Sequence, residues 1–326
     1  MLKKIFLIND TSLNQHHGCK ILNKALRKIL FSKKFHIVNR AYNNEEYGSV
    51  LKKLFNTKYD LILINGEGTL HDTNNYSDVI FKIINVAFKK LNVPIILINS
   101  VIQNLPKKNL NILKKCKKIY VRESYSFEYL KKNKINSKIV PDLLLSLDLK
   151  KNFKPSKNIL ITDSTLINMR FNLFELSKNR NLDFIPMMKR HDFTFSFNFL
   201  NVLRYIYGYF KNLILILLFN QRINYSDFHI NNSDKFLKRF SDYRFIITGR
   251  FHSVILCIIM EIPFYVIKSN TYKIEGLLND AKLTKRLKTF KFLKTRLNYE
   301  QKFSKSEINK IRKFKKMSKL KINKMF

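Results

Sequence analysis

Residues 60–72 read DLILINGEGTLHD, and this stretch decides the fold class. Its first half is a short apolar run, typical of a strand that is buried on both faces of a parallel sheet. The two glycines allow a tight turn whose amides can bind an anion. Since open α/β sheets bind ligands where a strand ends and a helix begins, the loop at 65–72 is a candidate site. A plain turn whose polar side chains cap the next helix is the alternative.

The alternation of strand-like and helix-like segments continues on both sides of this stretch. Apolar runs typical of strands occupy residues 5–8, 36–38, 61–64, 94–98 and 119–121. Apolar residues at three-to-four spacing predict helices over 19–31, 46–56, 77–91, 107–117 and 124–133. This pattern is typical of βα units, so we expect one doubly wound α/β domain over residues 1–148.

A second α/β domain is expected over residues 158–280, after a polar segment at 150–157 that contains Pro155. Its strands are predicted near 159–162, 183–187, 244–248 and 263–267.

Two further segments differ from this pattern. An aromatic and apolar insert covers 193–226, but its uninterrupted apolar run, 213–219, is too short to cross the ~30 Å of a bilayer core. A buried helical hairpin is expected there, with an element that seats on a membrane as the alternative. The lysine-rich segment 281–326 predicts a basic helical tail on the outside of the fold.

The charge balance is strongly basic, with 62 Lys and Arg against 23 Asp and Glu in 326 residues, a net charge of +39. Such an excess suggests nucleic acid or an anionic membrane as a partner. However, Lys, Asn, Ile, Phe and Tyr abound while Gly, Pro and Trp are scarce, as mutational drift toward AT-rich codons would produce. The charge is also spread along the chain without a recognition motif, so we expect no nucleic acid partner. Peripheral contact with an anionic membrane stays open.

Cysteine usage and the first residues predict a cytoplasmic protein. Cys19, Cys116 and Cys257 lie far apart and form no metal-binding or redox pair in the sequence. The start MLKKIFLIND has an apolar run too short for a secretion signal and predicts a first strand.

A second candidate loop, TGRFHS at 248–253, joins the strand RFIIT to the apolar helix VILCIIM. A helix start offers unpaired N–H groups, and Arg250 adds a planar fork suited to a carboxylate or phosphate. His252 can exchange a proton near neutral pH. The alternative is structural: Arg250 would pair with a core carboxylate, and His252 would be a satisfied histidine at the helix start.

Two more loops lie on the carboxyl side of predicted strands. The first is His16-His17-Gly18, of which one histidine can face the site. The second is Arg122-Glu123, where Arg122 is either an anion clamp or a partner of Asp142. A Walker loop, a G-x-G-x-x-G, a D-x-D and a G-x-S-x-G elbow are all missing from the sequence, which disfavours the enzyme classes that use them.

Together these loops resemble the polysaccharide pyruvyl transferase family over roughly residues 1–280. The matching segments are HHG (16–18), NGEGTLH (65–71), VRESYS (121–126), VPD (140–142), GRFH (249–252) and KIEGLL (273–278). The resemblance implies an α/β protein with two facing doubly wound domains of the GT-B kind and a ligand cleft between them. It also implies transfer of a pyruvyl group from phosphoenolpyruvate to two hydroxyls of a sugar, which forms a ketal and releases phosphate.

The resemblance places the donor on the Arg-x-His motif, Arg250 and His252, and on Arg122, with Ser126 in register. We expect His252 to be the general acid and Glu67 or His71 the base. The residues expected to bind substrate are Arg250, Arg122, Gly66, Gly68, His17, Ser126 and Glu275. Two positions depart from the family: its usual Gly-Asp is Gly18-Cys19 here, and its usual run of three glycines is Gly66-Glu67-Gly68.

The expected partners are phosphoenolpyruvate and a glycan, either a cell-surface polysaccharide or its lipid-linked precursor. No metal and no cofactor are expected, because cationic side chains can neutralise the leaving phosphate. The expected location is the cytoplasm, with the inner face of the cell membrane as an open possibility. A GT-B glycosyltransferase that uses a nucleotide sugar is the main alternative, and a non-catalytic scaffold of a glycan-assembly complex is another.

Overall fold

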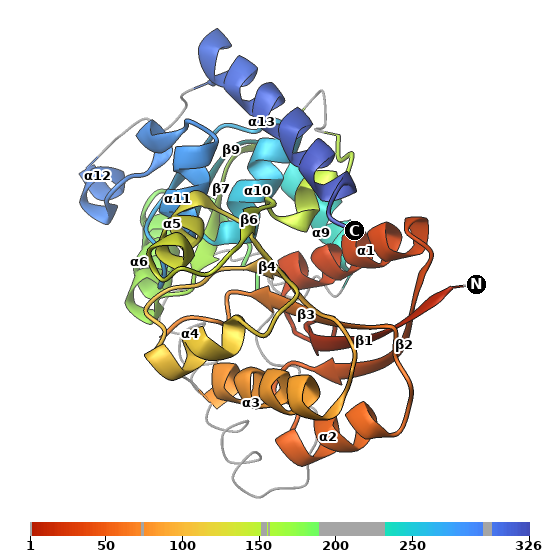
Figure 1. The fold of residues 1–326 in the computed structure, drawn as a ribbon. Coiled ribbons are helices and arrows are strands. Elements are labelled where there is room, and N and C mark those ends of the chain that lie inside the picture. The colour runs from red at the N-terminus through yellow and green to blue at the C-terminus, as the bar shows by residue number, and fades with distance from the viewer. Residues whose placement is uncertain (1, 73–74, 151–154, 156, 189–231, 296–301) are drawn as a thin grey trace, which may run out of the picture.

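The computed structural model describes the chain except for residues 1, 73–74, 151–154, 156, 189–231 and 296–301 (Figure 1). The insert expected at 193–226 therefore lies outside the described residues.

The N-terminal half forms a six-stranded parallel sheet in the order β2-β1-β3-β4-β5-β6. Its strands are β1 (Lys3–Asp10), β2 (Phe35–Tyr42), β3 (Leu61–Glu67), β4 (Ile95–Ser100), β5 (Lys118–Val121) and β6 (Lys138–Ile139). The helices that connect them are α1 (His17–Ser32), α2 (Tyr47–Phe55), α3 (Asn75–Lys90), α4 (Lys107–Leu113) and α5 (Ser124–Lys132). The strands and helices predicted for this half are confirmed, apart from shifts of a few residues at their ends and the unpredicted two-residue β6.

The alternation of side chains along β1 explains the double winding. Ile5 and Leu7 belong to a core that includes α1, whereas Phe6 and Ile8 belong to a second core with α2, α3 and α4. Because successive side chains of a strand point to opposite faces, a fully apolar strand needs helices on both sides.

The C-terminal half forms a four-stranded parallel sheet in the order β10-β9-β7-β8. Its strands are β7 (Lys157–Ser164), β8 (Asp183–Phe184), β9 (Tyr243–Gly249) and β10 (Phe264–Val266). Its helices are α6 (Ile167–Asn179), α9 (Ser233–Ser241), α10 (Phe251–Met260) and α11 (Lys273–Asp280). All ten residues of α10 are buried, as the run VILCIIM predicts.

One apolar core joins the two halves. It contains Leu7 of the first sheet, Ile246 of the second, and residues of α1, α10 and the 3-10 helix η1 (Leu143–Ser146). The domain boundary near residues 148–158 stays a prediction, since this core continues across it.

The tail is helical, as predicted, and returns to the first sheet. It consists of the 3-10 helix η2 (Thr284–Arg286), α12 (Phe290–Thr295) and α13 (Lys305–Asn323). A capping box between Ser304 and Glu307 starts α13. Figure 1 shows α13 running toward α1. Just after α13 ends, the Met325 carbonyl accepts a hydrogen bond of 2.7 Å from the Tyr120 hydroxyl of β5.

None of the described helices is both long and apolar enough to span a bilayer.

Candidate active site

The carboxyl ends of strands from both sheets meet at a cavity of about 420 Å³. Glu67 and Gly68 reach it from the end of β3, and Arg250, Phe251 and His252 reach it from the turn between β9 and α10. The other lining residues are Thr11, Asn14, His16, Cys19, Asn43, Thr69, His71, Tyr76, Arg122, Thr165 and Lys273. The two loops that the sequence singled out therefore share one cavity.

Arg250 is the N-cap residue of α10 and is held by the neighbouring strand β7. One of its terminal nitrogens, Nη2, pairs with Oδ2 of Asp163, whose other oxygen accepts from the Met187 amide at 2.9 Å. The pairing that the sequence left as an alternative thus exists. It leaves the guanidinium on the cavity wall, fixed in orientation.

Arg122 follows β5 and is held in a similar way. Its Nη1 lies 3.2 Å from Oδ2 of Asp142, and its guanidinium lies 4.0 Å from the centre of the Phe251 ring. Burial, only partly offset by Arg122, raises the pKa of Asp142 to about 6. Arg122 is therefore the partner of Asp142 and also lies on the cavity wall, so this pairing does not remove it as a candidate anion clamp.

Lys273 is a third buried cation, and the sequence reasoning did not select it. It opens α11, is 7% exposed, and donates from Nζ to Oδ1 of Asn270 at 2.8 Å. Burial, together with the charges of Arg122 and Arg250, lowers the pKa of Lys273 to about 7. Such a lysine gains its proton readily when an anion arrives beside it.

Several nitrogens in this wall have unused hydrogen-bonding capacity. Among the described residues, Nε of Arg122, Nε of Arg250 and Nε2 of His252 are buried without a hydrogen-bond partner. Because an unpaired buried polar atom is costly, such atoms indicate a place for a polar ligand. The cavity also adjoins the N-termini of α1 and α10, each of which favours an anion.

His252 lies between the two halves of the protein. Its Nε2 is 3.8 Å from Oδ2 of Asp142, and its ring centre is 5.4 Å from that of His16. A Cβ on Gly18 would come within 2.4 Å of Nδ1 of His252, so only glycine allows α1 to approach this ring. Burial, then Arg122, Lys273 and Arg250, keeps the pKa of His252 well below its usual value.

The two candidate bases have different surroundings. Glu67 is 6% exposed and has a left-handed backbone, with φ of 40°. Its carboxylate accepts from Thr11 Oγ1, from Asn65 Nδ2 at 3.0 Å, and from Cys19 Sγ at 3.3 Å. Three donors hold this carboxylate in place, so Glu67 is better suited to positioning the wall than to taking a proton.

His71 lies at the rim of the same cavity, with Nδ1 2.8 Å from Oδ2 of Asp72. A carboxylate on one ring nitrogen fixes the tautomer and the orientation of the imidazole. Of the two expected bases, the geometry favours His71, with Asp72 as its positioning residue.

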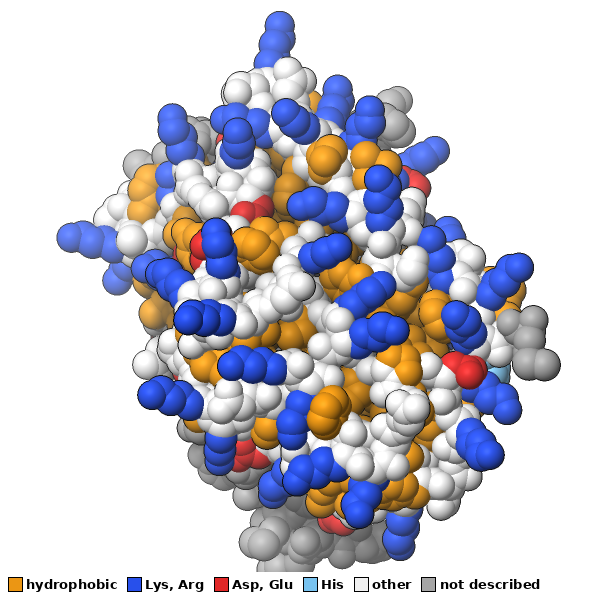
Figure 2. All heavy atoms as spheres, in the orientation of Figure 1, with side chains coloured by type: hydrophobic (Ala, Val, Ile, Leu, Met, Phe, Trp, Pro, Cys, Tyr) orange, Lys and Arg blue, Asp and Glu red, His pale blue; other side chains and the backbone are white. Residues whose placement is uncertain are grey.

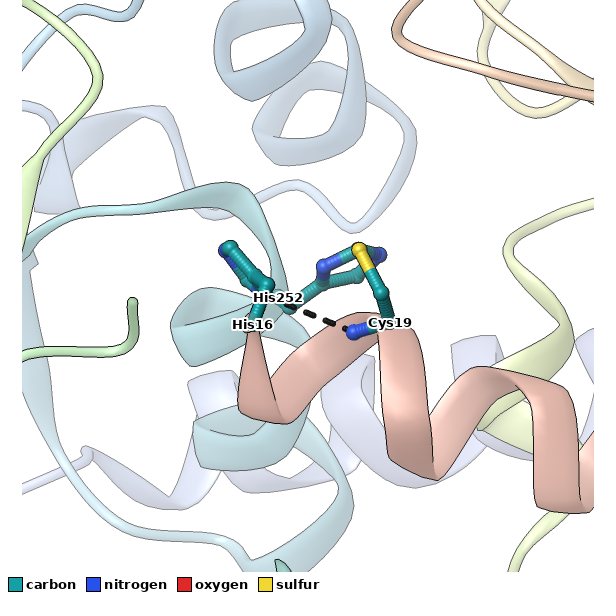
Figure 3. A group of neighbouring side chains, drawn as sticks. All are labelled: His16, Cys19 and His252. Carbon is teal, nitrogen blue, oxygen red and sulfur yellow. Dashed lines mark hydrogen bonds between the residues drawn. The ribbon is translucent and has the colours of Figure 1, made fainter. Parts of the chain in front are cut away.

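His16, Cys19 and His252 bring three potential metal-ligand atoms within 4.8 Å of one another (Figure 3). The surroundings disfavour a cation there, because three cationic side chains and two helix N-termini adjoin the cluster. The Cys19 thiol donates to Glu67, and burial raises its pKa well above the ordinary value. The same surroundings suit an anion.

Four residues expected to bind substrate do not line the cavity in this structure. His17 stacks on Phe236 with ring centres 4.3 Å apart, while His16 takes the cavity position. Ser126 accepts from the Ile102 amide at 2.9 Å and bonds to Glu123.

The other two are Gly66 and Glu275. Gly66 packs against Ser100, whose Oγ would lie 2.0 Å from an added Cβ. Glu275 lies in the first turn of α11, two residues beyond Lys273. Gly68 does line the cavity, and its missing side chain leaves room next to Lys273 and Arg122.

The fold and this cleft define a class: a protein with two doubly wound α/β units that face each other, the GT-B arrangement. A putative UDP-N-acetylglucosamine 2-epimerase from Listeria monocytogenes is similar in structure, with a TM-score of 0.51 at 10% identity, over 99% of this chain and 91% of that one. A functionally uncharacterised protein from Klebsiella pneumoniae follows, with a TM-score of 0.49 and 15% identity, over 88% and 93% of the two chains. At such identities the likeness concerns the fold alone. No curated protein sequence matches the chain.

Within that class the family is clear. Residues 16–271 match the polysaccharide pyruvyl transferase model, and this range includes the loops at 16–18, 65–72 and 248–253 as well as Arg122. The chain belongs to the polysaccharide pyruvyl transferase family and is a transferase.

Proposed function

We propose that the protein transfers the pyruvyl group of phosphoenolpyruvate to two hydroxyls of a glycan sugar, forming a ketal and releasing phosphate. The observation that carries this proposal is the convergence of three buried cationic side chains, Arg122, Arg250 and Lys273, on one cavity. Phosphoenolpyruvate carries a phosphate and a carboxylate within a few bonds of each other. Cations from three separate elements suit such a compact anion. A nucleotide sugar spreads its charge over a diphosphate and extends much further.

The reaction balances without any further reactant. The methylene carbon of the donor gains a proton, and one sugar oxygen adds to the neighbouring carbon. The bond from that carbon to the phosphate oxygen then breaks, and the second sugar oxygen takes its place. Of the two hydroxyl protons, one replaces the proton delivered to carbon and the other leaves with phosphate.

The residues then have the following roles. Arg122, Arg250 and Lys273 hold the donor, and His252 protonates its methylene carbon. His71, oriented by Asp72, accepts a proton from a sugar hydroxyl. In the free protein burial keeps His252 neutral, but the donor's negative charges oppose the effect of the three cations on its pKa. The bound donor therefore shifts His252 toward its protonated form.

Donor binding should weaken as the pH rises above 7. In Lys273→Met the donor affinity should depend less steeply on pH, because the part of the slope that comes from Lys273 is lost. An anion beside Lys273 raises its pKa from about 7, so the donor-bound protein holds an extra proton above that pH. The dissociation constant then rises by up to about tenfold per pH unit for this one group. Titration calorimetry with phosphoenolpyruvate between pH 7 and 9 measures it.

The matched control is Lys268→Met, which changes an exposed lysine just before α11. Thermal unfolding of Lys273→Met without donor adds a second measurement. Because the charged form of Lys273 is disfavoured in the folded protein, we expect the variant to be at least as stable as the wild type near pH 6. Equal pH slopes in both proteins, or a large loss of stability, would show that Lys273 is structural.

The acceptor that we propose is a cell-surface polysaccharide or its lipid-linked precursor, modified on the cytoplasmic side of the membrane. Lysine and arginine side chains are scattered over the whole face shown in Figure 2 and outnumber the acidic ones there, which supports contact with anionic lipid. Sedimentation with phosphatidylglycerol vesicles at low salt should exceed that with phosphatidylcholine vesicles. Equal sedimentation would remove membrane contact from the proposal but leave the chemistry intact.

A further inference from the structure

A second cavity, of about 200 Å³, shares a wall with the 420 Å³ cavity of the candidate active site, which we call the donor cavity. Asn43 and Tyr76 line both, so the two spaces adjoin through these side chains. The second cavity lies over the ends of β1 and β2 and the starts of α2 and α3. It is smaller than the ~300–1,000 Å³ typical of sites for drug-sized ligands, and its volume suits one sugar ring.

The charged residues that line this second cavity are acidic, whereas the chain as a whole is strongly basic. The chain has 62 Lys and Arg against 23 Asp and Glu, yet Glu45 and Glu46 line this cavity and no Lys or Arg is among its described lining residues. Glu45 pairs with Lys53 at 2.5 Å, which leaves the exposed Glu46 as the uncompensated charge. An anionic occupant is therefore disfavoured, in contrast to the donor cavity.

The remaining lining has the chemistry of a site for a sugar. Ile8, Val50 and Ile80 form an apolar base, and Asn9, Asn43 and Asn44 supply amide groups. Tyr42 and Tyr76 add aromatic rings, and Tyr76 is 51% exposed, so a ligand can reach its face. A sugar ring presents C–H groups on its faces and hydroxyls at its edge, which matches this division.

The polar wall is also fixed in place. Asn43 donates from Nδ2 to Oδ1 of Asn9 at 2.7 Å, and Asn9 donates to the Asn65 carbonyl at 2.6 Å. Asn9 and Asn44 both have left-handed backbones, with φ of 60° and 69°. Non-glycine residues keep such conformations where the surrounding structure enforces them, and these residues cluster at binding sites.

We infer that this second cavity binds the acceptor sugar, as a neutral ring rather than an acidic or phosphorylated one, with Tyr76 stacked on it at the border of the donor cavity. The inference rests on the proposed function and adds the place and charge class of the acceptor. His71, five residues before Tyr76, lies on the donor side of the same border. A sugar in this position presents its hydroxyls to the donor cavity.

The test uses the full-length protein and two probes, methyl β-D-glucopyranoside and methyl β-D-glucuronide, with saturation-transfer NMR to detect binding. We expect binding of the neutral glycoside alone, weakened about tenfold or more by Tyr76→Ala and largely kept by Tyr76→Phe. The matched control is Tyr125→Ala, a tyrosine of α5 that is 41% exposed and lines neither cavity.

Binding that Tyr76→Ala leaves unchanged, or equal binding of the glucuronide, would overturn the inference. Failure of the neutral glycoside to bind would overturn it as well. Calorimetry with phosphoenolpyruvate on the same variants separates this result from the proposed function. Tyr76 borders both cavities, so the contrast between the two ligands decides: if Tyr76→Ala weakens glycoside binding by a larger factor than donor binding, the acceptor site is supported. If neither the wild type nor any variant binds phosphoenolpyruvate, but the glycoside binds as expected, only the proposed chemistry fails.

Discussion

His252→Asn should reduce turnover by about 10²–10⁴-fold while donor binding stays nearly unchanged, because a positioned proton donor contributes on that scale. The asparagine amide occupies about the same space as the part of the imidazole ring nearest the backbone. It cannot donate the proton that the methylene carbon of the donor needs. Nε2 of His252 has no hydrogen-bond partner among the described residues, so the substitution breaks no bond at that atom. Steady-state phosphate release gives the turnover, and calorimetry gives the donor affinity.

The control for this variant is His36→Asn, which changes an exposed histidine of β2. Thermal unfolding of both variants shows whether activity and stability fall together. Normal turnover of His252→Asn would remove His252 from the mechanism. If that variant does not fold, His252→Gln provides the same comparison with a longer side chain.

Arg250→Lys should weaken donor binding by about 1–3 kcal/mol, or roughly 5–150-fold, with a smaller effect on turnover. Lysine keeps one positive charge but loses the planar fork. In the wild type one nitrogen of this fork serves Asp163, while Nε has no partner among the described residues. A single ammonium cannot serve Asp163 and the donor with the same geometry.

Arg244→Lys is the matched control, since Arg244 lies on the same strand, β9, and is exposed. Because lysine can still pair with Asp163, the melting temperature of Arg250→Lys should stay close to that of the wild type. A large fall in stability together with unchanged donor affinity would indicate that Arg250 serves only to hold Asp163.

The sequence predicts the sheets well because their strands are short apolar runs buried on both faces. Such runs, as at 61–64 and 244–248, have few alternatives once glycine-bearing turns follow them. The two-residue strand β6 has no such signal. Its place depends on pairing with β5, a long-range contact that periodicity does not reveal.

The cavity was predicted in outline and not in detail. Glycine is so scarce in this chain that Gly68 and Gly249 mark their loops without any alignment. Lys273 opens the KIEGLL segment of the resemblance, but one lysine among 62 basic residues does not stand out as a site residue until its burial is known. The choice between His16 and His17 depends on the first turn of α1, where one residue of rotation decides which ring reaches the cavity.

The Glu67 side chain illustrates a different limit. Spacing places it in the ligand loop, and its carboxylate suggests a base. Only the structure reveals the three donors that hold it and the left-handed backbone from which it extends. The sequence thus located the residue, but its part in the site depends on contacts with Thr11 just after β1, with Asn65 of β3 and with Cys19 of α1.

The central claim, pyruvyl transfer from phosphoenolpyruvate, is tested most directly by the donor requirement of the purified full-length protein. The protein is incubated with a panel of free and lipid-linked glycans, together with either phosphoenolpyruvate or nucleotide sugars, and released phosphate and nucleotide are measured beside the product mass. We expect phosphate release that requires both phosphoenolpyruvate and a glycan, with one pyruvyl ketal formed per phosphate. Nucleotide release from a nucleotide sugar, with phosphoenolpyruvate left unconsumed, would contradict the account and identify a glycosyltransferase instead.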